Sequence, residues 1–194
     1  MANAFQPGGR SAAPAPLVLV QDFVNTEIPE WQRDDIATPP LLAGWLAARG
    51  LVPVGSEADG DSFVVARELR RGLRELALAH TLDRAPTAAA RAALDVVLAR
   101  LPIRFALRES AAVRVVPTGR TVESALAAIV AIVLEAEHDG TWSRLKACRK
   151  DSCRWVFYDG SRNRSSSWCS MQICGNRVKA RAARRRRASG TGSG

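Results

Sequence analysis

Residues 148–177 have the sequence CRKDSCRWVFYDGSRNRSSSWCSMQICGNR and contain all four cysteines of this 194-residue chain. Four residues separate Cys148 from Cys153 and Cys169 from Cys174, and fifteen residues lie between the two pairs. Two close cysteine pairs joined by a loop can supply four thiolates to one tetrahedral zinc ion, a borderline-soft cation. The spacing therefore predicts one structural Zn²⁺ site. Because four protein ligands leave no position for water, catalysis by this metal is not expected.

The residues around the cysteines predict a small folded unit. Trp155, Phe157 and an Asp159-Gly160 turn favour a hairpin that returns the second cysteine pair to the first, and a helix is expected from about Met171. Knuckle, hairpin and helix together resemble a treble-clef finger. Trp155 and Trp168 are interpreted as core residues of this unit rather than as groups that stack on bases.

Positive charge is concentrated in the same part of the chain. Residues 144–187 contain 14 Lys/Arg and two acids, a net charge of 14 − 2 = +12. The rest contains 28 − 14 = 14 basic and 19 − 2 = 17 acidic residues, a net charge of −3. A nearly neutral body joined to a cationic segment indicates a polyanionic partner.

A helix through the basic segment predicts a nucleic-acid interface. Arg177, Arg181, Arg184 and Arg185 would share one face, which fits the major groove of DNA. The predicted contacts are Arg162, Arg164, Arg177, Lys179, Arg181, Arg184 and Arg185. An RNA-binding or ribonucleoprotein-associated module is the main alternative, since a basic segment also attracts structured RNA.

Residues 17–140 predict an α+β domain that is mostly helical and contains one small β-hairpin. A flexible lead is expected over 1–16, the finger over 141–188 and a disordered tail over 189–194. Leu17–Val24 is an apolar run, strand-like but too short to distinguish from a helix. The hydrophobic pattern predicts helices from Pro39 to Gly50, over 63–80, over 87–101 and over 121–138, and a hairpin between about 103 and 115.

Polar residues of this domain suggest a pocket for a small-molecule effector. The candidates are Asp22, Asn25, Thr26, Arg67 and Arg70. For the first three, capping of the next element is the preferred interpretation and a ligand pocket is the alternative. The arginines between 67 and 74 would ordinarily form a solvated stripe. His80 is expected to be buried and hydrogen-bonded. No nucleophile–base pair, acid pair or phosphate loop is present, so no enzymatic activity is predicted.

The pattern of apolar residues favours a cytoplasmic, nucleoid-associated protein with no membrane partner. Residues 1–9 lack the features of a signal peptide, and the longest apolar run, Ala125–Leu134, is shorter than the ~20 residues of a membrane span. Reduced cysteines in such a compartment favour metal binding over disulfides. Four unrelated free thiols, or a redox switch that releases the metal on oxidation, remain alternatives.

Two known families resemble this chain. WCSMQICGNRVKARAARRRR and the preceding residues from about 145 resemble the CGNR zinc finger of bacterial transcription regulators. VLVQDFVNTE, TPPLLAGWLAARGL and the arginine-rich helix from Phe63 resemble the ABATE domain that precedes this finger. Ser166 and Ser167 stand where the finger commonly has a basic pair, so phosphate contacts fall to Arg162, Arg164 and the helix.

The resemblance implies a transcriptional regulator that binds DNA through its C-terminal basic helix. The N-terminal domain would then sense a ligand or stress signal, or dimerise. A homodimer is expected because one short finger covers few base pairs and pairing doubles the footprint. No heptad seam is visible, so the dimer interface would come from the N-terminal domain.

Overall fold

We describe a computed structural model of the chain, in which residues 6–107, 109, 113–178 and 180 are placed. Four of the residues predicted to contact nucleic acid lie outside the described residues, as does the predicted disordered tail 189–194. The four are Lys179, Arg181, Arg184 and Arg185.

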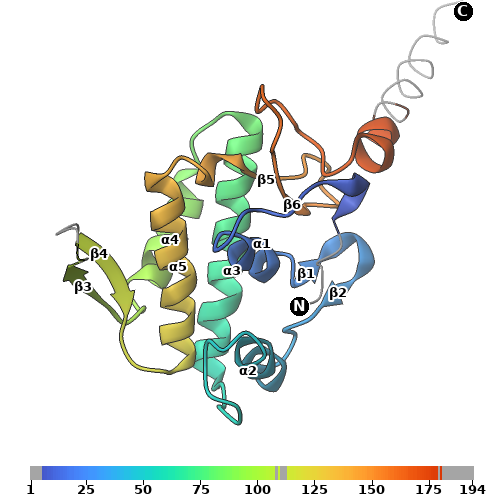
Figure 1. The fold of residues 1–194 in the computed structure, drawn as a ribbon. Helices are drawn as coiled ribbons and strands as arrows, with labels where there is room; N and C mark the ends of the chain where they lie inside the picture. Colours follow the sequence, from blue (N-terminus) through green and yellow to red (C-terminus); the bar gives the residue numbers. More distant parts are fainter. Residues whose placement is uncertain (1–5, 108, 110–112, 179, 181–194) are drawn as a thin grey trace, which may run out of the picture.

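Helices and three small two-stranded sheets make up the described fold (Figure 1). The α-helices are α1 Val18–Val24, α2 Pro39–Ala47, α3 Gly60–Leu82, α4 Ala88–Leu98 and α5 Val122–His138. The antiparallel pairs are β1 Glu27–Ile28 with β2 Arg33–Asp34, β3 Ile103–Leu107 with β4 Val113–Pro117, and β5 Leu145–Ala147 with β6 Val156–Tyr158. Short turns of other helical type are η1 Pro7–Gly9, η2 Pro29–Trp31, η3 Trp142–Arg144 and η4 Met171–Gly175. The predicted α+β class is confirmed.

The three longest helices begin at side chains that cap them. Asp59 accepts a hydrogen bond from Ser62 N at 2.7 Å at the start of α3, and Thr121 accepts one from Ser124 N at 3.3 Å at the start of α5. Thr87 does the same for α4. These oxygens satisfy backbone N–H groups that have no partner within the helix. None of the helices in the described part of the chain is long and apolar enough to cross a membrane.

The apolar run Leu17–Val24 is helical rather than strand-like. Val20, Phe23 and Val24 are at most 1% exposed, because α1 packs against α3, α5 and β6 at once. A helix covered on several sides is apolar around most of its surface. The 3.6-residue period of a half-buried helix is therefore missing from this segment.

The finger and the N-terminal domain share one hydrophobic core. Leu145, Ala147 and Val156 of the β5–β6 pair belong to the same cluster of buried residues as the helices. On α3, His80 Nδ1 lies 2.9 Å from Leu145 O and Thr81 Oγ1 donates to Ala147 O at 2.7 Å. Strand β5 therefore lies directly on α3 (Figure 1).

Residues 6–16 lie against the finger, which differs from the flexible lead that the sequence predicted. Gly8 has φ +72°, and a Cβ there would lie 2.8 Å from Ser170 Oγ. Ala13 N donates to Gln21 Oε1 at 2.8 Å, and Ala13 is buried. Glycine and proline in this segment permit a tight, close-fitting path rather than disorder.

Candidate metal centre and nucleic-acid interface

Local hydrogen bonds place the four cysteines. Cys148 directly follows β5, and its N–H donates to Trp155 O at 2.8 Å, so the β5–β6 hairpin encloses the knuckle that contains Cys153. The predicted hairpin turned at Asp159-Gly160 instead; that turn is wrong, because Asp159 follows β6. Cys169 lies after the serine-rich loop, and Cys174 lies in η4, where its N–H donates to Ser170 O at 2.9 Å.

The four sulfur atoms have the spacing of a tetrahedral metal site. All four buried Sγ atoms lie within 4.8 Å of one another. Sγ of Cys153 lies 3.7 Å from that of Cys169, which lies 3.6 Å from that of Cys174. Four thiolates at ~2.3 Å from one zinc ion are separated by about 3.8 Å. Disulfide sulfurs would be only about 2 Å apart, so the geometry fits a metal and not a bridge.

The electrostatics of the cluster also favour a bound cation. Hydrogen bonds from Cys153 and Cys169 lower the pKa of Cys148 well below its ordinary value. The same contacts raise the pKa of Cys153 and Cys169, and burial raises that of Cys174. Without a cation, one thiolate keeps its neighbours protonated, whereas a divalent metal stabilises the thiolate form of each ligand. The donor set thus fits a four-thiolate metal site.

Arg10 contacts the metal site from the N-terminal segment. Its Nε donates to Cys169 O at 2.8 Å and its Nη2 to Trp168 O at 3.0 Å. The guanidinium carbon lies 4.6 Å from the centre of the Phe157 ring. Arg10 therefore fixes the backbone at one ligand. Sequence reasoning missed this residue, since nothing in an Ala-, Pro- and Gly-rich segment distinguishes it.

A buried ion pair organises the loop that contains two of the predicted DNA-binding arginines. Asp159, fully buried, accepts hydrogen bonds from Ser161, from Ser166 and from Lys146 Nζ at 3.1 Å. Although burial acts in the opposite direction, these hydrogen bonds hold the pKa of Asp159 below its ordinary value. Lys146 also donates to Arg164 O. Ser166 is thus a structural residue of the loop.

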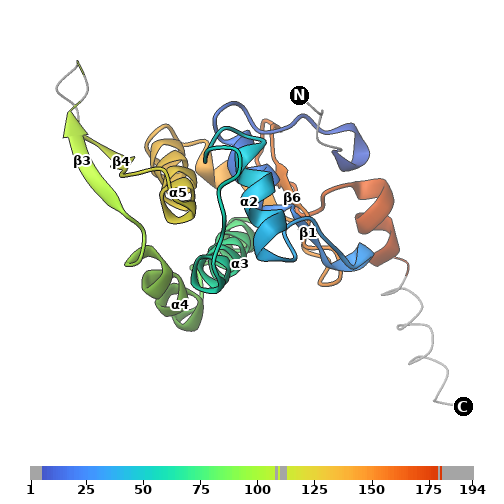
Figure 2. The ribbon, with the colours of Figure 1, turned by 90° about the horizontal axis from the view of Figure 1, so that it is seen from below.

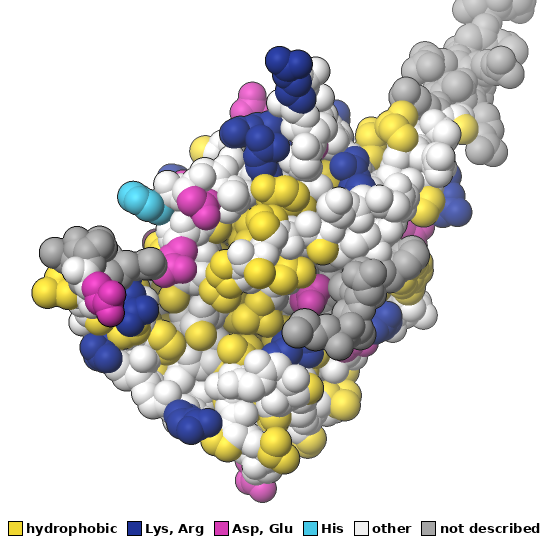
Figure 3. Space-filling model, in the orientation of Figure 1, with side chains coloured by type: hydrophobic (Ala, Val, Ile, Leu, Met, Phe, Trp, Pro, Cys, Tyr) yellow, Lys and Arg dark blue, Asp and Glu magenta, His cyan; other side chains and the backbone are white. Residues whose placement is uncertain are grey.

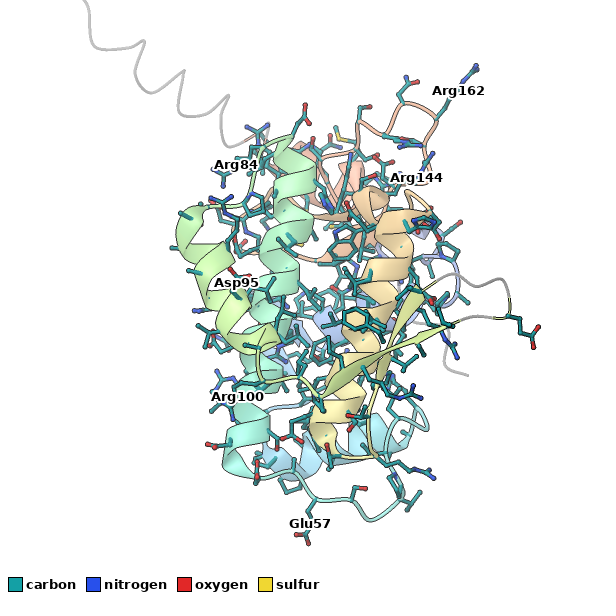
Figure 4. The ribbon with its side chains drawn as sticks, turned by 90° about the vertical axis from the view of Figure 1, so that its left-hand side faces the viewer. Glu57, Arg84, Asp95, Arg100, Arg144 and Arg162 are labelled. Carbon is teal, nitrogen blue, oxygen red and sulfur yellow. The ribbon has the colours of Figure 1, made fainter. Side chains whose placement is uncertain are left out.

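Exposed arginines surround this loop. Figure 4 shows Arg162 at the loop tip, pointing away from the body. The side chains of Arg162 and Arg164 are exposed and form no ion pair with another described residue. Beside them lies a hollow of about 440 Å³, lined mainly by serines, by Arg10 and by Trp168. Hydroxyl and guanidinium groups at an open hollow suit phosphate oxygens.

Arg177 lies at the start of the basic segment and is 65% exposed. Its Nη1 lies 3.5 Å from Glu30 Oε1, and the same oxygen accepts a hydrogen bond from Lys150. Glu30 belongs to η2 of the N-terminal domain. An acid of one domain therefore contacts two cations of the other, a relation that the sequence did not indicate.

The predicted effector residues separate into two groups. Asp22, Asn25 and Thr26 line a hollow of about 390 Å³ where the N-terminal domain meets the finger. Arg67 and Arg70 are not among its lining residues. Arg70 is 2% exposed and pairs with Asp34 at 2.6 Å, so the expectation of a solvated stripe is wrong for this position.

Arg74, in the same helix, is 7% exposed and donates to Val24 O at 2.7 Å and to Glu27. It is therefore also part of the fold rather than of a solvated stripe. Arg67 lies by the Phe63 ring, with its guanidinium carbon 5.7 Å from the ring centre. None of these arginines faces the hollow.

Comparison with family models gives two matches in the predicted order. The ABATE model, described as "Putative stress-induced transcription regulator", matches residues 17–137, and the CGNR zinc finger model matches residues 144–187. No curated protein matches the chain. The first match covers more than half of the sequence. The chain therefore belongs to the ABATE family, with a CGNR zinc finger C-terminal to its ABATE domain.

Proposed function

We propose that this protein is a zinc-dependent transcriptional regulator that binds DNA through its finger and basic C-terminal segment. The observation that supports this most directly is the position of the four-thiolate site beside exposed arginines. Arg177 follows the ligand Cys174 by three residues, so the metal site fixes the direction of its backbone. The proposal assigns no enzymatic reaction and places the protein at the nucleoid.

Zn²⁺ is the metal that we propose for the cysteine site. Cys148, Cys153, Cys169 and Cys174 would bind it, and it would crosslink the knuckle to η4. The buried cluster around the cysteines is small, with Phe157 and Trp155 as its largest members and Ile28 of β1 as its one residue from the N-terminal domain. Metal binding supplies much of the folding free energy of such units. Metal analysis of purified protein should find one zinc per chain.

DNA is the proposed partner because the exposed arginines suit phosphates. Fluorescence anisotropy with duplex DNA at several salt concentrations tests this directly. Neutralisation of ~6 phosphates would give a log–log salt slope near about −5. The double variant Arg162→Gln/Arg164→Gln should bind more weakly and show a slope reduced by about 2. Arg104→Gln/Arg120→Gln, the same charge change at two exposed arginines of the N-terminal domain, is the matched control.

Structured RNA is the competitor that decides between the two candidate partners. At fixed salt, duplex DNA should displace labelled DNA better than a structured RNA of equal charge. Preferential displacement by RNA would favour the ribonucleoprotein-associated module instead. Equal binding of the Arg162/Arg164 variant and the parent to both nucleic acids would contradict a role for this loop.

We further propose that the N-terminal domain senses an effector and forms a homodimer. The hollow lined by Asp22, Asn25 and Thr26 supports the first role. The β3–β4 hairpin supports the second, because Phe105, Leu107 and Val113 are 73%, 70% and 66% exposed. Both Figures 1 and 2 show this hairpin projecting from the body.

A further inference from the structure

The hollow of about 390 Å³ between the two domains has a composition that selects a ligand class. We call it the junction pocket. Its lining includes three tryptophans, Trp31 before β2, Trp45 of α2 and Trp155 of the finger knuckle. Its volume is within the range of pockets for small organic ligands. Because Trp155 of the finger lines the pocket together with residues of the N-terminal domain, a ligand here would contact both domains at once.

The tryptophans offer π faces at the pocket wall. The rings of Trp31 and Trp155 are 6.0 Å apart between centroids and inclined by 51°. Trp155 is 8% exposed, whereas Trp31 is 53% exposed, so Trp31 is the wall that is able to move. Stacking of an aromatic ring on such faces is favourable beyond the burial of its area.

Two acids and two arginines line the pocket. One acid and one arginine form an ion pair with each other, and the other two do not. Arg33 donates to Asp35 through Nε at 2.7 Å and through Nη2 at 2.8 Å, which neutralises both. The half-buried side chain of Asp22 forms no hydrogen bond or ion pair with another described residue. Burial raises the pKa of Asp22, and the charge of Arg49 opposes this rise. Among the described residues, this carboxylate therefore has none of the hydrogen-bond donors that a buried acid ordinarily has.

Arg49 carries the charge opposite to that of Asp22. Its guanidinium carbon lies 3.7 Å from the centre of the Trp45 ring, and its Nη1 donates to Trp45 O at 3.2 Å. It forms no ion pair with Asp22 or with another described carboxylate. An acid and a base thus line one aromatic pocket without contacting each other. A ligand with both charges could join them, whereas a purely cationic or anionic ligand would meet a like charge.

We propose that the junction pocket binds an aromatic zwitterion of the amino-acid class, with its ring between Trp31 and Trp155, its ammonium on Asp22 and its carboxylate on Arg49. This rests on the sensing role proposed above. A ring between two others needs about 7 Å between them, twice the carbon contact distance. Since the present centroid separation is 6.0 Å, binding moves Trp31 outward.

Movement of Trp31 couples the pocket to the finger. Trp31 and Glu30 are neighbours in η2, and Glu30 contacts Lys150 and Arg177. Outward movement of this turn separates Glu30 from Arg177 and leaves that cation available to a phosphate. The ligand therefore increases DNA affinity, and DNA increases ligand affinity by the same factor.

Isothermal titration calorimetry with three matched probes tests the ligand class. L-Phenylalanine has both charges, 2-phenylethylamine has only the ammonium, and 3-phenylpropionate has only the carboxylate. We expect L-phenylalanine to bind about tenfold more tightly than either analogue, or better, since each loses one charge-assisted hydrogen bond. Equal affinity for the amine would show a cation site and overturn the proposal, as would no binding of L-phenylalanine at millimolar concentration.

Two variants test which residue binds each charged group of the ligand. Asp22→Asn should remove the preference for L-phenylalanine over 3-phenylpropionate, and Arg49→Gln should remove the preference over 2-phenylethylamine. Asp95→Asn, an equal charge change on the exposed face of α4, should keep both preferences (Figure 4). Thermal melts show whether each variant is folded. Unchanged preferences in both pocket variants would contradict the assignment.

Measuring DNA binding with and without the probe distinguishes two outcomes: a protein that binds DNA but has no ligand coupling, and a protein that does not bind DNA. Anisotropy titrations without any probe test DNA binding alone. With saturating L-phenylalanine, the DNA dissociation constant should fall by a few-fold. DNA binding that is normal without the probe and unaffected by it would overturn the coupling while the DNA-binding function stands. If the protein bound the ligand but no DNA, the DNA-binding function would be overturned while the ligand site stands.

Discussion

Glu30 is an acidic side chain that contacts two cations of the finger, Lys150 and Arg177, and under the proposed function it would compete with DNA for them. Its Oε1 contacts Lys150 and lies 3.5 Å from Arg177 Nη1. The variant Glu30→Gln should bind DNA a few-fold more tightly. An exposed ion pair contributes ~0.2–1 kcal/mol, and in the variant DNA binding would not have to break the pair between Glu30 and Arg177. Anisotropy at fixed salt measures the change.

Glu57→Gln is the control for this charge change, since Glu57 is exposed at the end of the molecule opposite Arg162 (Figure 4). A general electrostatic effect would raise DNA affinity equally in both variants. That result would contradict a specific role for Glu30.

Asp159 is the second residue whose charge matters, here for stability. Its folded-state pKa is lowered, so its contribution is complete above the ordinary aspartate pKa near ~4 and declines as the pH falls below that value. Asp159→Asn should lower the free energy of unfolding at pH 7 by roughly 3 kcal/mol, because Lys146 would remain buried without its partner. Urea titrations at pH 7 and pH 3 measure the difference, which should narrow at pH 3.

Asp95→Asn provides the comparison for the exposed case, where little change is expected at either pH. If the Asp159→Asn difference were equally large at pH 3, the charge of Asp159 would not be its source.

Among the elements, α1 determines how the N-terminal domain meets the finger. Asn25 at its C-terminal end donates through Nδ2 to Val156 O at 2.7 Å and accepts through Oδ1 from Val156 N at 2.8 Å. The side chain pairs with β6 as a neighbouring strand would. Asn25→Asp removes the donor and sets a carboxylate against a carbonyl, which should cost about 1–3 kcal/mol of stability. Chemical denaturation measures this loss.

Asn163→Asp makes the same chemical change on an exposed loop residue and should have little effect on stability. An equal loss in both variants would indicate that the charge, and not the pairing with Val156, is responsible.

The secondary-structure elements also show which parts of the fold can be predicted from the sequence. Helices α2 to α5 and the β3–β4 hairpin were predicted because their patterns, caps and Pro or Gly boundaries are local signals. The metal ligands were predicted because spacing alone brings cysteine pairs together. The sequence does not distinguish helix from strand at α1, since a helix buried on several sides lacks the 3.6-residue period of apolar and polar residues. Arg70 was misjudged, because its partner Asp34 lies on a segment whose position only the tertiary fold determines.

At the scale of the whole molecule, the shared core predicts that the finger and the N-terminal domain unfold together. Strand β5 packs on α3, and Val156 belongs to the main cluster of buried residues. Removal of the metal with a chelator should therefore lower the melting temperature of the entire protein in one transition, since a ligand of the folded state stabilises every part that unfolds with it. Circular dichroism at the helix band, with hydrogen exchange at Thr81, measures the effect.

Readdition of zinc should restore the original melting temperature. Two separate transitions, with the helices unaffected by the chelator, would show instead that the finger unfolds alone.

The projecting β3–β4 hairpin is the surface on which the proposed homodimer would form. Phe105 pairs with Val115 and Leu107 with Val113 across the strands, so these apolar side chains lie on one face of the hairpin. A two-stranded hairpin is only marginally stable alone in water, and an exposed apolar face of this kind supports the proposed dimer contact. Hydrophobic side chains also gather over the middle of the face shown in Figure 3.

Phe105→Ser/Leu107→Ser should convert the proposed homodimer to a monomer, and Val54→Ser/Val96→Ser is the control because these two valines are exposed elsewhere, at 92% and 67%. Sedimentation velocity measures the oligomeric state. The monomeric variant should bind a two-site DNA at least about tenfold more weakly, since two linked fingers share one binding event, yet should bind a single site as the parent does. The dimer proposal would be contradicted if the parent protein sedimented as a monomer at micromolar concentration and preferred two-site DNA no more than the variant does. Each finger would then bind DNA alone.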